Sequence, residues 1–248
     1  MSDWLGLDGR RVLIAGGAGT LGAALVASFL EAGAVVGVID VDEAGMAAHT
    51  PGASVRVAAD LRHAPACREA VHAAANGLGD VDVFVHCLGV NDRRPIEEYD
   101  EETWDDIVAV NLSSAFHTAQ AVVPTLREQG RGRIVFLSSV AGRSGHRHHG
   151  PYAATKGAVN QLTRVMAHEY AERGVTVNAV APGYMDTALT RAYLAEDPGR
   201  REALVDLIPA GRLGTLTEVV DPVLFLASDR ASFITGHVLY VDGGRSVL

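Results

Sequence analysis

The chain alternates short apolar runs with longer amphipathic stretches. Runs rich in Val, Ile and Leu have the length and composition of buried strands, and they span Arg11–Ala15, Val35–Ile39, Val55–Ala58, Val81–His86, Arg133–Leu137, Val175–Ala181 and His237–Val241. Stretches with helical periodicity separate them, at Thr20–Ala32, Glu43–Ala48, Ala64–Asn76, Thr103–Gln129, Tyr152–Arg173 and Leu216–Ala227. Because strands that alternate with helices form βαβ units, the pattern predicts an α/β fold. We expect a Rossmann-type, doubly wound parallel sheet of about seven strands with helices on both faces.

The length of 248 residues and the 48% hydrophobic content suit one domain with a sizeable core over residues 1–248. Residues 183–214 are the least regular stretch, with short helices predicted at Ala188–Leu194 and Gly199–Ile208. This stretch follows the sixth predicted strand, so we expect it to lie over the ligand-binding edge as a lid. An insertion that simply packs on the core is the alternative.

The charge and cysteine content narrow the class of protein. A net charge of −9 disfavours nucleic acid and anionic membrane surfaces as partners. The first residues show no signal peptide, and no apolar run is long enough to span a bilayer. Two cysteines, Cys67 and Cys87, form no disulfide framework and suit a reducing compartment. We therefore expect a cytoplasmic protein that acts on a small molecule.

One lysine stands out among 21 basic residues, because the other twenty are arginine. Lys156 follows Tyr152 by four residues, so both side chains share one face of a predicted helix. A lysine ammonium is a compact charge, whereas an arginine is a flat fork that does not deprotonate. The pair predicts a site where an ammonium acts beside a phenol, with a surface lysine as the alternative.

Ser139 ends a predicted buried strand, thirteen residues before Tyr152. A hydroxyl at the carboxyl end of a strand lies at the edge where open α/β sheets bind ligands. Ser138 and Ser139 alone would suggest a turn. Together with Tyr152 and Lys156, Ser139 instead predicts a proton-transfer set.

A glycine-rich turn follows the first predicted strand and precedes an apolar helix. Gly16, Gly19 and Gly22 allow the backbone to turn tightly and to approach a pyrophosphate at the helix N-terminus. This context predicts a dinucleotide site, with a merely structural turn as the alternative.

Two aspartates follow the next two predicted strands. Asp40 is placed to accept both ribose hydroxyls of the adenosine half and to repel a 2′-phosphate, so NAD is favoured over NADP. Asp60 is placed to bind an adenine amino group. For both residues, capping of the following helix is the alternative.

These features in this order resemble the short-chain dehydrogenase/reductase family over essentially the whole chain. The resemblance includes the glycine turn, the Tyr-x-x-x-Lys pair with its upstream serine, and three further motifs at Asn111, Pro182-Gly183 and Val241-Asp242-Gly243-Gly244. It implies a catalytic tetrad of Asn111, Ser139, Tyr152 and Lys156. Tyr152 would be the general acid or base, with its pKa lowered by Lys156, and Ser139 would polarise the substrate oxygen.

Asn111 would position a water in the proton relay; a buried asparagine that bonds backbone groups is the alternative. Thr187 would meet the nicotinamide carboxamide or cap a short helix. The implied cofactor contacts are Gly16, Gly19, Thr20, Leu21, Gly22, Asp40, Asp60, Leu61, Gly89, Tyr152, Lys156, Pro182, Gly183 and Thr187.

The sequence departs from the family pattern in three places. Thr20 stands where the family has the middle glycine of its turn, and Ala15 stands where a threonine is usual. The segment His86-Cys87-Leu88-Gly89 replaces Asn-Asn-Ala-Gly. His86 is expected to be a buried core histidine, or else to replace the missing asparagine bonds, and Cys87 a small buried filler.

The residues expected near the substrate are basic and polar. Arg93, His146 and His149 suit a carboxylate or a polyhydroxylated compound better than a steroid. A solvated loop charge is the alternative for Arg93, and exposed loop positions are the alternative for the histidines. No metal site is expected. The segments 89–95, 181–185 and 208–214 resemble the branch with gluconate 5-dehydrogenases and 2-deoxy-D-gluconate 3-dehydrogenases.

The resemblance thus implies an NAD(H)-dependent oxidoreductase that acts on a secondary alcohol or ketone of a small polar substrate, such as a sugar acid. A 3-oxoacyl-acyl-carrier-protein reductase and a cyclic-ketone or steroid-type reductase are the alternative enzymes. A catalytically silent NAD-binding sensor is the alternative outside the enzyme class. The resemblance also implies a homotetramer or a homodimer.

Overall fold

A single parallel sheet forms the centre of the structure. The computed structural model describes residues 4–187, 190–191, 194 and 198–247. The strands follow the order β3-β2-β1-β4-β5-β6-β7, and they are β1 Arg11–Ala15, β2 Val35–Asp40, β3 Val55–Ala58, β4 Val83–His86, β5 Gly132–Leu137, β6 Val175–Pro182 and β7 Val238–Val241. The order reverses between β1 and β4, and this leaves a crevice at the carboxyl ends of these strands. The predicted fold class is confirmed.

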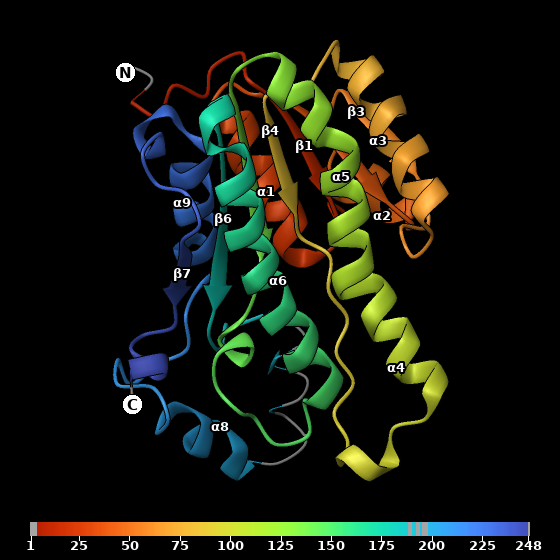
Figure 1. The fold of residues 1–248 in the computed structure, drawn as a ribbon. Helices are drawn as coiled ribbons and strands as arrows, with labels where there is room; N and C mark the ends of the chain where they lie inside the picture. The colour runs from red at the N-terminus through yellow and green to blue at the C-terminus, as the bar shows by residue number, and fades with distance from the viewer. Residues whose placement is uncertain (1–3, 188–189, 192–193, 195–197, 248) are drawn as a thin grey trace.

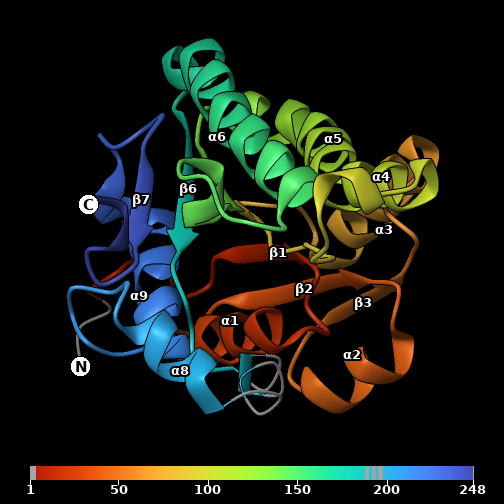
Figure 2. The same ribbon diagram turned by 90° about the horizontal axis from the view of Figure 1, so that it is seen from below.

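Helices cover both faces of the sheet (Figures 1 and 2). The described helices are α1 Thr20–Glu31, α2 Glu43–His49, α3 Ala64–Leu78, α4 Glu101–Val108, α5 Ser114–Glu128, α6 Gly150–Tyr170, α8 Pro198–Val205 and α9 Leu216–Ala227. In the view from below, α3 to α6 lie on one side of the sheet, and α1 and α9 lie on the other. Within the described part of the chain, no helix is both long and apolar enough to cross a membrane.

The two faces arise from the period of two along each strand. In β1, Leu13 and Ala15 pack into the core under α3, α5 and α6. Val12 and Ile14 point the other way, into the core under α1 and α9. All four side chains are fully buried. A strand that is apolar at every position therefore sits between two layers of helices.

The long helix predicted over Thr103–Gln129 is interrupted in the structure. A π-helical turn at Ala109–Ser113 separates α4 from α5, and the Ser114 amide bonds to the carbonyl of Ala109. The Ser114 hydroxyl also donates to the Val110 carbonyl at 2.5 Å. The apolar period of the sequence continues through the π-helical turn, so the sequence pattern did not predict this interruption.

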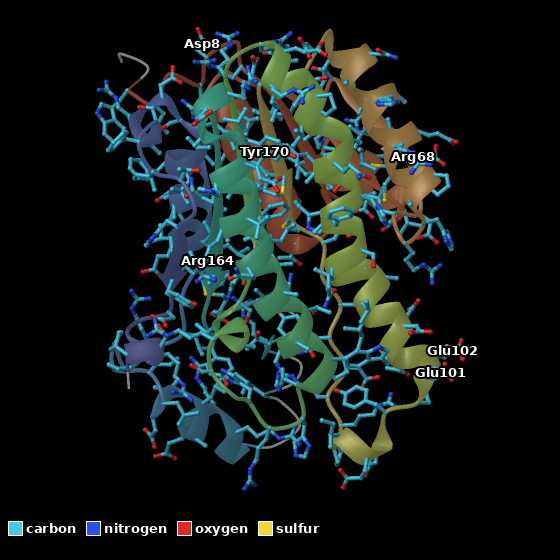
Figure 3. The ribbon with its side chains drawn as sticks, viewed as in Figure 1. Asp8, Arg68, Glu101, Glu102, Arg164 and Tyr170 are labelled. Atoms are coloured by element: carbon cyan, nitrogen blue, oxygen red, sulfur yellow. The ribbon has the colours of Figure 1, made fainter. Side chains whose placement is uncertain are left out.

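The first turn of α4 is acidic. Figure 3 shows the side chains of Glu101 and Glu102 pointing outward from it. Asp100 is the N-cap of this helix. Negative charge at a helix N-terminus is favourable because the peptide dipoles align there.

The segment 183–214 lies beyond the end of β6, where a lid was predicted. α8 overlaps the predicted Gly199–Ile208 helix but begins one residue earlier, at Pro198, and it lies below the carboxyl ends of β6 and β7 (Figure 1). Leu194, Ile208 and Leu213 form a small apolar cluster of their own. Most of the predicted Ala188–Leu194 helix lies outside the described residues. The lid role stays a prediction.

Asp82 is a buried carboxylate at the amino-terminal end of β4, far from the carboxyl ends of the strands. It accepts hydrogen bonds from Arg11 Nε at 2.8 Å and Nη2 at 2.9 Å, and from Arg131 Nη2 at 3.2 Å. Burial alone would raise the pKa of Asp82, but the bonds from Arg11 hold this pKa below its ordinary value. The pair fixes β1 to β4 at one end of the sheet.

We predict that Asp82→Asn lowers the free energy of unfolding by about 2 kcal/mol at pH 7, because it removes the carboxylate that accepts charge-assisted hydrogen bonds from Arg11 and Arg131. The folded-state pKa of Asp82 is depressed, so its contribution is present above about pH 4 and is lost as pH falls through the folded pKa. Urea unfolding at pH 7 and at pH 3 measures this. An equal loss at both pH values would contradict the role of the ionised carboxylate.

Candidate functional site

Two glycines at the turn after β1 occupy positions where a side chain has no room. Gly16 has φ +89°, and a Cβ there would lie 3.0 Å from the backbone of Cys87 and Leu88. A Cβ at Gly22 would lie 2.0 Å from the Gly16 carbonyl oxygen. The loop and the first turn of α1 therefore pack together through glycine alone.

The N-terminus of α1 faces the carboxyl edge of the sheet. Gly19 is its N-cap and provides no side-chain hydrogen bond, so the amides of Thr20, Leu21 and Gly22 have no partner within the helix. Such amides and the helix dipole favour a phosphate group. Thr20 is exposed at the first position of α1, so this departure from the family pattern leaves the turn intact.

Asp40 ends β2 beside the glycine turn. It is 8% exposed, and its carboxylate accepts hydrogen bonds from the amides of Ala18 at 2.9 Å and Asp42 at 3.1 Å. The alternative that Asp40 caps the next helix is wrong, because Asp42 is the N-cap of α2. Asp40 instead fixes the turn against the end of β2.

A cavity of about 250 Å³ opens beside Asp40, and its lining includes Asp60, Leu61, Arg62 and Asp106. Asp60 does not cap α3, whose N-cap is His63. Its carboxylate accepts from Arg62 Nη2 at 2.6 Å, while Arg62 Nη1 donates to Asp106 at 2.8 Å. The adenine contact of Asp60 stays a prediction. Arg62 was not singled out from the sequence, because only the fold brings α4 against this loop.

Ser139 and Tyr152 meet at the carboxyl end of β5. Ser139 is the N-cap of a short 3₁₀ helix and accepts from the amide of Ala141 at 3.1 Å. Its hydroxyl is hydrogen-bonded to the phenol of Tyr152, which lies in the first turn of α6. The neighbouring Ser138 points away and donates to Asn160 Oδ1 at 2.6 Å. Of the two neighbouring serines, Ser139 is therefore the one whose hydroxyl lies beside the Tyr152 phenol.

Lys156 is buried one turn after Tyr152 and is 3% exposed. Its Nζ donates to the carbonyls of Leu137 at 2.8 Å and Leu88 at 3.3 Å, and it lies 5.8 Å from the centre of the Tyr152 ring. Burial lowers the pKa of Lys156 to about 8. A Cβ at Gly89 would lie 3.2 Å from Nζ, so the glycine leaves space for the ammonium.

The expectation that Lys156 brings the pKa of Tyr152 below its ordinary value is wrong for this structure. Burial raises the pKa of Tyr152, and the hydrogen bond from Ser139 and the charge of Arg93 only partly oppose this rise. The Lys156 ammonium points to main-chain carbonyls instead. The phenol is therefore held in its protonated form at neutral pH.

Asn111 lies in the π-helical turn and is fully buried. Its Oδ1 accepts from the Val90 amide at 2.8 Å, and its Nδ2 donates to the Val90 carbonyl at 2.9 Å and to Thr155 Oγ1 at 3.2 Å. These are the contacts of an asparagine that satisfies backbone groups. They attach the loop after β4 to α6, next to Tyr152 and Lys156, and the water-binding role stays a prediction.

His86 replaces an asparagine of the family pattern with a buried imidazole. It is 1% exposed, and its Nε2 lies 2.8 Å from Ser114 Oγ. Burial and the charge of Lys156 lower the pKa of His86 to about 3, so it is neutral. His86 is both a core residue and a hydrogen-bonding one, and it anchors the end of β4 to the start of α5.

A second cavity, of about 180 Å³, lies in front of Ser139 and Tyr152. Arg93, His146 and His149, the residues expected near the substrate, all line it. Asn91, Tyr184 and Thr190 also line it and were not predicted. Tyr184 directly follows Pro182-Gly183 at the end of a strand, and this position could have identified it as a cavity residue from the sequence.

The residues after β6 form part of the wall of the cavity in front of Ser139 and Tyr152. A Cβ at Gly183 would lie 2.8 Å from Asp242 Cα, so glycine permits β6 and the end of β7 to approach. Thr187 Oγ1 accepts from the Thr190 amide at 3.2 Å, which is the contact of a capping residue. The predicted contact of Thr187 with the nicotinamide carboxamide stays a prediction, and so does the predicted cofactor contact of Pro182.

These features fit a nicotinamide dinucleotide. Gly16 and Gly22 keep the turn tight beside the N-terminus of α1, the cavity beside Asp40 has space for an adenosine, and Lys156 still has a third N–H to donate. Within the described residues, no group of three or more His, Cys, Asp or Glu side chains is placed to hold a metal ion.

Comparison with known proteins agrees with this geometry. A family model described as "Enoyl-(Acyl carrier protein) reductase" matches residues 16–246. The 5-keto-D-gluconate 5-reductase of Escherichia coli K12 is 34% identical over 253 residues, which cover 100% of this chain and 99% of the relative. The 3-oxoacyl-[acyl-carrier-protein] reductase of the same strain is 40% identical over 167 residues, which are 67% of each chain.

A solved structure gives the same result for the fold. The gluconate 5-dehydrogenase of Burkholderia cenocepacia J2315, in complex with NADP and tartrate, superposes with a TM-score of 0.92 at 33% identity, and the match covers 99% of this chain and 98% of that one. The resemblance found in the sequence is therefore confirmed. This chain belongs to the short-chain dehydrogenase/reductase family of oxidoreductases that act on CH–OH groups.

Proposed function

We propose that the protein is an NAD(H)-dependent dehydrogenase/reductase that interconverts a secondary alcohol and a ketone in a sugar acid. The observation that carries the proposal is the cavity in which Ser139 and Tyr152 face Arg93. A proton donor, a second hydroxyl and a cation share this space. A small anionic substrate with a reacting oxygen matches all three groups.

Tyr152 is the proposed proton donor to the ketone. Its raised pKa keeps the phenol protonated at neutral pH. The phenol can therefore donate its proton when a ketone is reduced. Ser139 donates to the same substrate oxygen and holds it next to the phenol. When bound, the nicotinamide supplies or accepts the hydride, and the glycine turn, Asp40 and Lys156 are the residues placed to hold the dinucleotide.

Arg93 is the proposed contact for the substrate carboxylate. Its charge acts on Tyr152, His146 and His149, so it faces the reacting end of the cavity. Relatives named for gluconate or 5-keto-D-gluconate cover the full chain, and the solved relative contains tartrate, a hydroxylated dicarboxylate. These names support a sugar acid as the substrate class.

The adenosine side favours NAD in this proposal. Three carboxylates, Asp40, Asp60 and Asp106, line the cavity there, against the single guanidinium of Arg62. Arg62 is itself bonded to Asp60 and Asp106. A 2′-phosphate would meet a net negative wall. NADP is present in solved relatives, and it is the alternative cofactor that an experiment must distinguish from NAD.

A 3-oxoacyl-acyl-carrier-protein reductase is the second candidate, because such a relative matches two thirds of the chain at 40% identity. The polar and basic lining of the substrate cavity weighs against an acyl chain. A silent sensor is disfavoured because the serine, tyrosine and lysine are all present and brought together.

We predict that NADH absorbance assays show reduction of 5-keto-D-gluconate in preference to an acetoacetyl thioester or a cyclic ketone. Tyr152→Phe removes the proton donor and lowers kcat by about 10³-fold or more, while NADH still binds. Turnover of the thioester alone would support the second candidate. Retained turnover in Tyr152→Phe would remove the phenol from proton transfer.

We predict that Asp40→Ala reduces the preference for NADH over NADPH by about tenfold or more, because it removes one carboxylate from the wall that would face a 2′-phosphate. The ratio of kcat/KM for the two cofactors measures this effect. Asp42→Ala is the matched control, since Asp42 caps α2 and does not line the cavity. An unchanged ratio in Asp40→Ala contradicts the ribose assignment.

We predict that Arg93→Ala lowers kcat/KM for 5-keto-D-gluconate by about 30-fold, because the variant removes a charge-assisted hydrogen bond. L-sorbose has a hydroxymethyl group in place of the carboxylate, and its kcat/KM should change less than about threefold. Arg94→Ala is the control, because Arg94 bonds to Asp92 and does not line the cavity. Equal losses on both substrates would count against a carboxylate contact.

A further inference from the structure

Four aromatic side chains form a row along one wall of the substrate cavity. The ring of Tyr152 lies 6.2 Å from that of His149, which lies 5.8 Å from His146, which lies 5.9 Å from Tyr184. Each neighbouring pair is edge-on. All four residues line the same cavity as Ser139. A substrate that reacts at Tyr152 and extends along this wall meets His149 first and then His146.

The tautomer of His149 follows from its hydrogen bond. Its Nδ1 lies 2.7 Å from the carbonyl oxygen of Arg147. A carbonyl only accepts, so Nδ1 carries the proton. Burial and the nearby charge of Arg93 lower the pKa of His149, so the ring is neutral at pH 7. A neutral ring with its proton on Nδ1 presents a lone pair at Nε2, which is a fixed hydrogen-bond acceptor.

His146 has an unsatisfied nitrogen. Its Nδ1 lies 3.0 Å from the hydroxyl of Tyr184, whereas its Nε2 is buried and has no hydrogen-bond partner among the described residues. A buried polar atom without a partner is costly, so native structures seldom leave one unless a ligand or a water occupies the position. Tyr184 holds the ring in place and lets Nε2 serve as a donor or as an acceptor, according to the tautomer.

We propose that His146 and His149 form a hydroxyl-binding subsite that selects polyhydroxylated substrates. His149 Nε2 accepts a hydrogen bond from the hydroxyl on the carbon next to the reacting one, and His146 Nε2 pairs with the following hydroxyl. The inference rests on the proposed function for the identity of the reacting carbon. It adds that the hydroxyl pattern, as well as the carboxylate, determines which substrate is accepted.

The neighbouring His148 provides a contrast within the same loop. It is exposed and does not line the cavity. Its φ of +63° is a left-handed conformation that asparagine also tolerates. His148→Asn is therefore a matched control that removes an imidazole from the loop and leaves the cavity wall unchanged.

The first test compares 5-keto-D-gluconate with its 4-deoxy analogue, which lacks the hydroxyl next to the ketone on the carboxylate side and keeps the one on the terminal carbon. We expect the wild-type protein to prefer the hydroxylated ketone by about 100-fold in kcat/KM, because a site built to bond a hydroxyl discriminates against its absence. In His149→Phe, which keeps an aromatic ring, the preference should fall below about threefold. His149→Gln places an amide near the Nε2 position and should restore part of it.

Retention of the full preference in His149→Phe, or its loss in His148→Asn, would overturn the proposal. Binding of NADH by each variant, followed by fluorescence, shows that the variants are folded. A loss of turnover on both ketones together with a loss of NADH binding would mean that His149→Phe disturbs the fold. In that case His149→Gln tests whether His149 binds the hydroxyl.

A second measurement does not depend on turnover. Long-range ¹H–¹⁵N spectra of the NADH-bound protein report the Nε2 resonance of His149, and addition of D-gluconate should shift it in the wild-type protein and in His148→Asn. An unmoved resonance at saturating D-gluconate overturns the subsite even if sugar acids are reduced. A shifted resonance without any turnover of sugar acids supports the subsite and overturns the proposed function.

Discussion

The buried ammonium of Lys156 joins the segments that make up the site. Its Nζ donates to the carbonyls that end β5 and follow β4, at Leu137 and Leu88. α6, which carries Lys156, is thereby fixed against two neighbouring strands at the point where the sheet opens. Burial lowers the pKa of this group to about 8, so the ammonium form still dominates at neutral pH. An arginine fork would need more space than Gly89 leaves.

The electrostatics of the two cavities are opposite in sign. Carboxylates dominate the wall at the ends of β2 and β3, whereas Arg93 faces the substrate side. The proposed NAD and the proposed anionic substrate would therefore occupy different ends of one crevice. Because the parallel strands place all their carboxyl ends at the same edge, these charges come from distant parts of the sequence and meet only there.

Burial has opposite consequences for the two titrating groups in α6. It lowers the pKa of the Lys156 ammonium and raises that of the Tyr152 phenol, because each loses the solvation of its charged form. Both groups therefore remain protonated near neutral pH. A protonated phenol beside Ser139 suits donation to a ketone, and the neutral histidines on the same wall suit hydroxyl groups. These protonation states agree with the proposed reduction of a polyhydroxylated ketone.

The apolar pattern alone predicted the parallel sheet, most of its helices and the edge where the site lies, because burial on both faces requires continuous apolar strands. Motif spacing predicted Ser139, Tyr152, Lys156 and the glycine turn as site features, because each motif is a short sequence pattern at the end of a strand or the start of a helix. Only the tertiary structure decided the rest: the π-helical turn at Asn111, the Arg62 ion pairs, the Tyr184–His146 contact and the rise in the pKa of Tyr152. These features depend on contacts and solvation between segments that are far apart in the chain, which local periodicity does not encode.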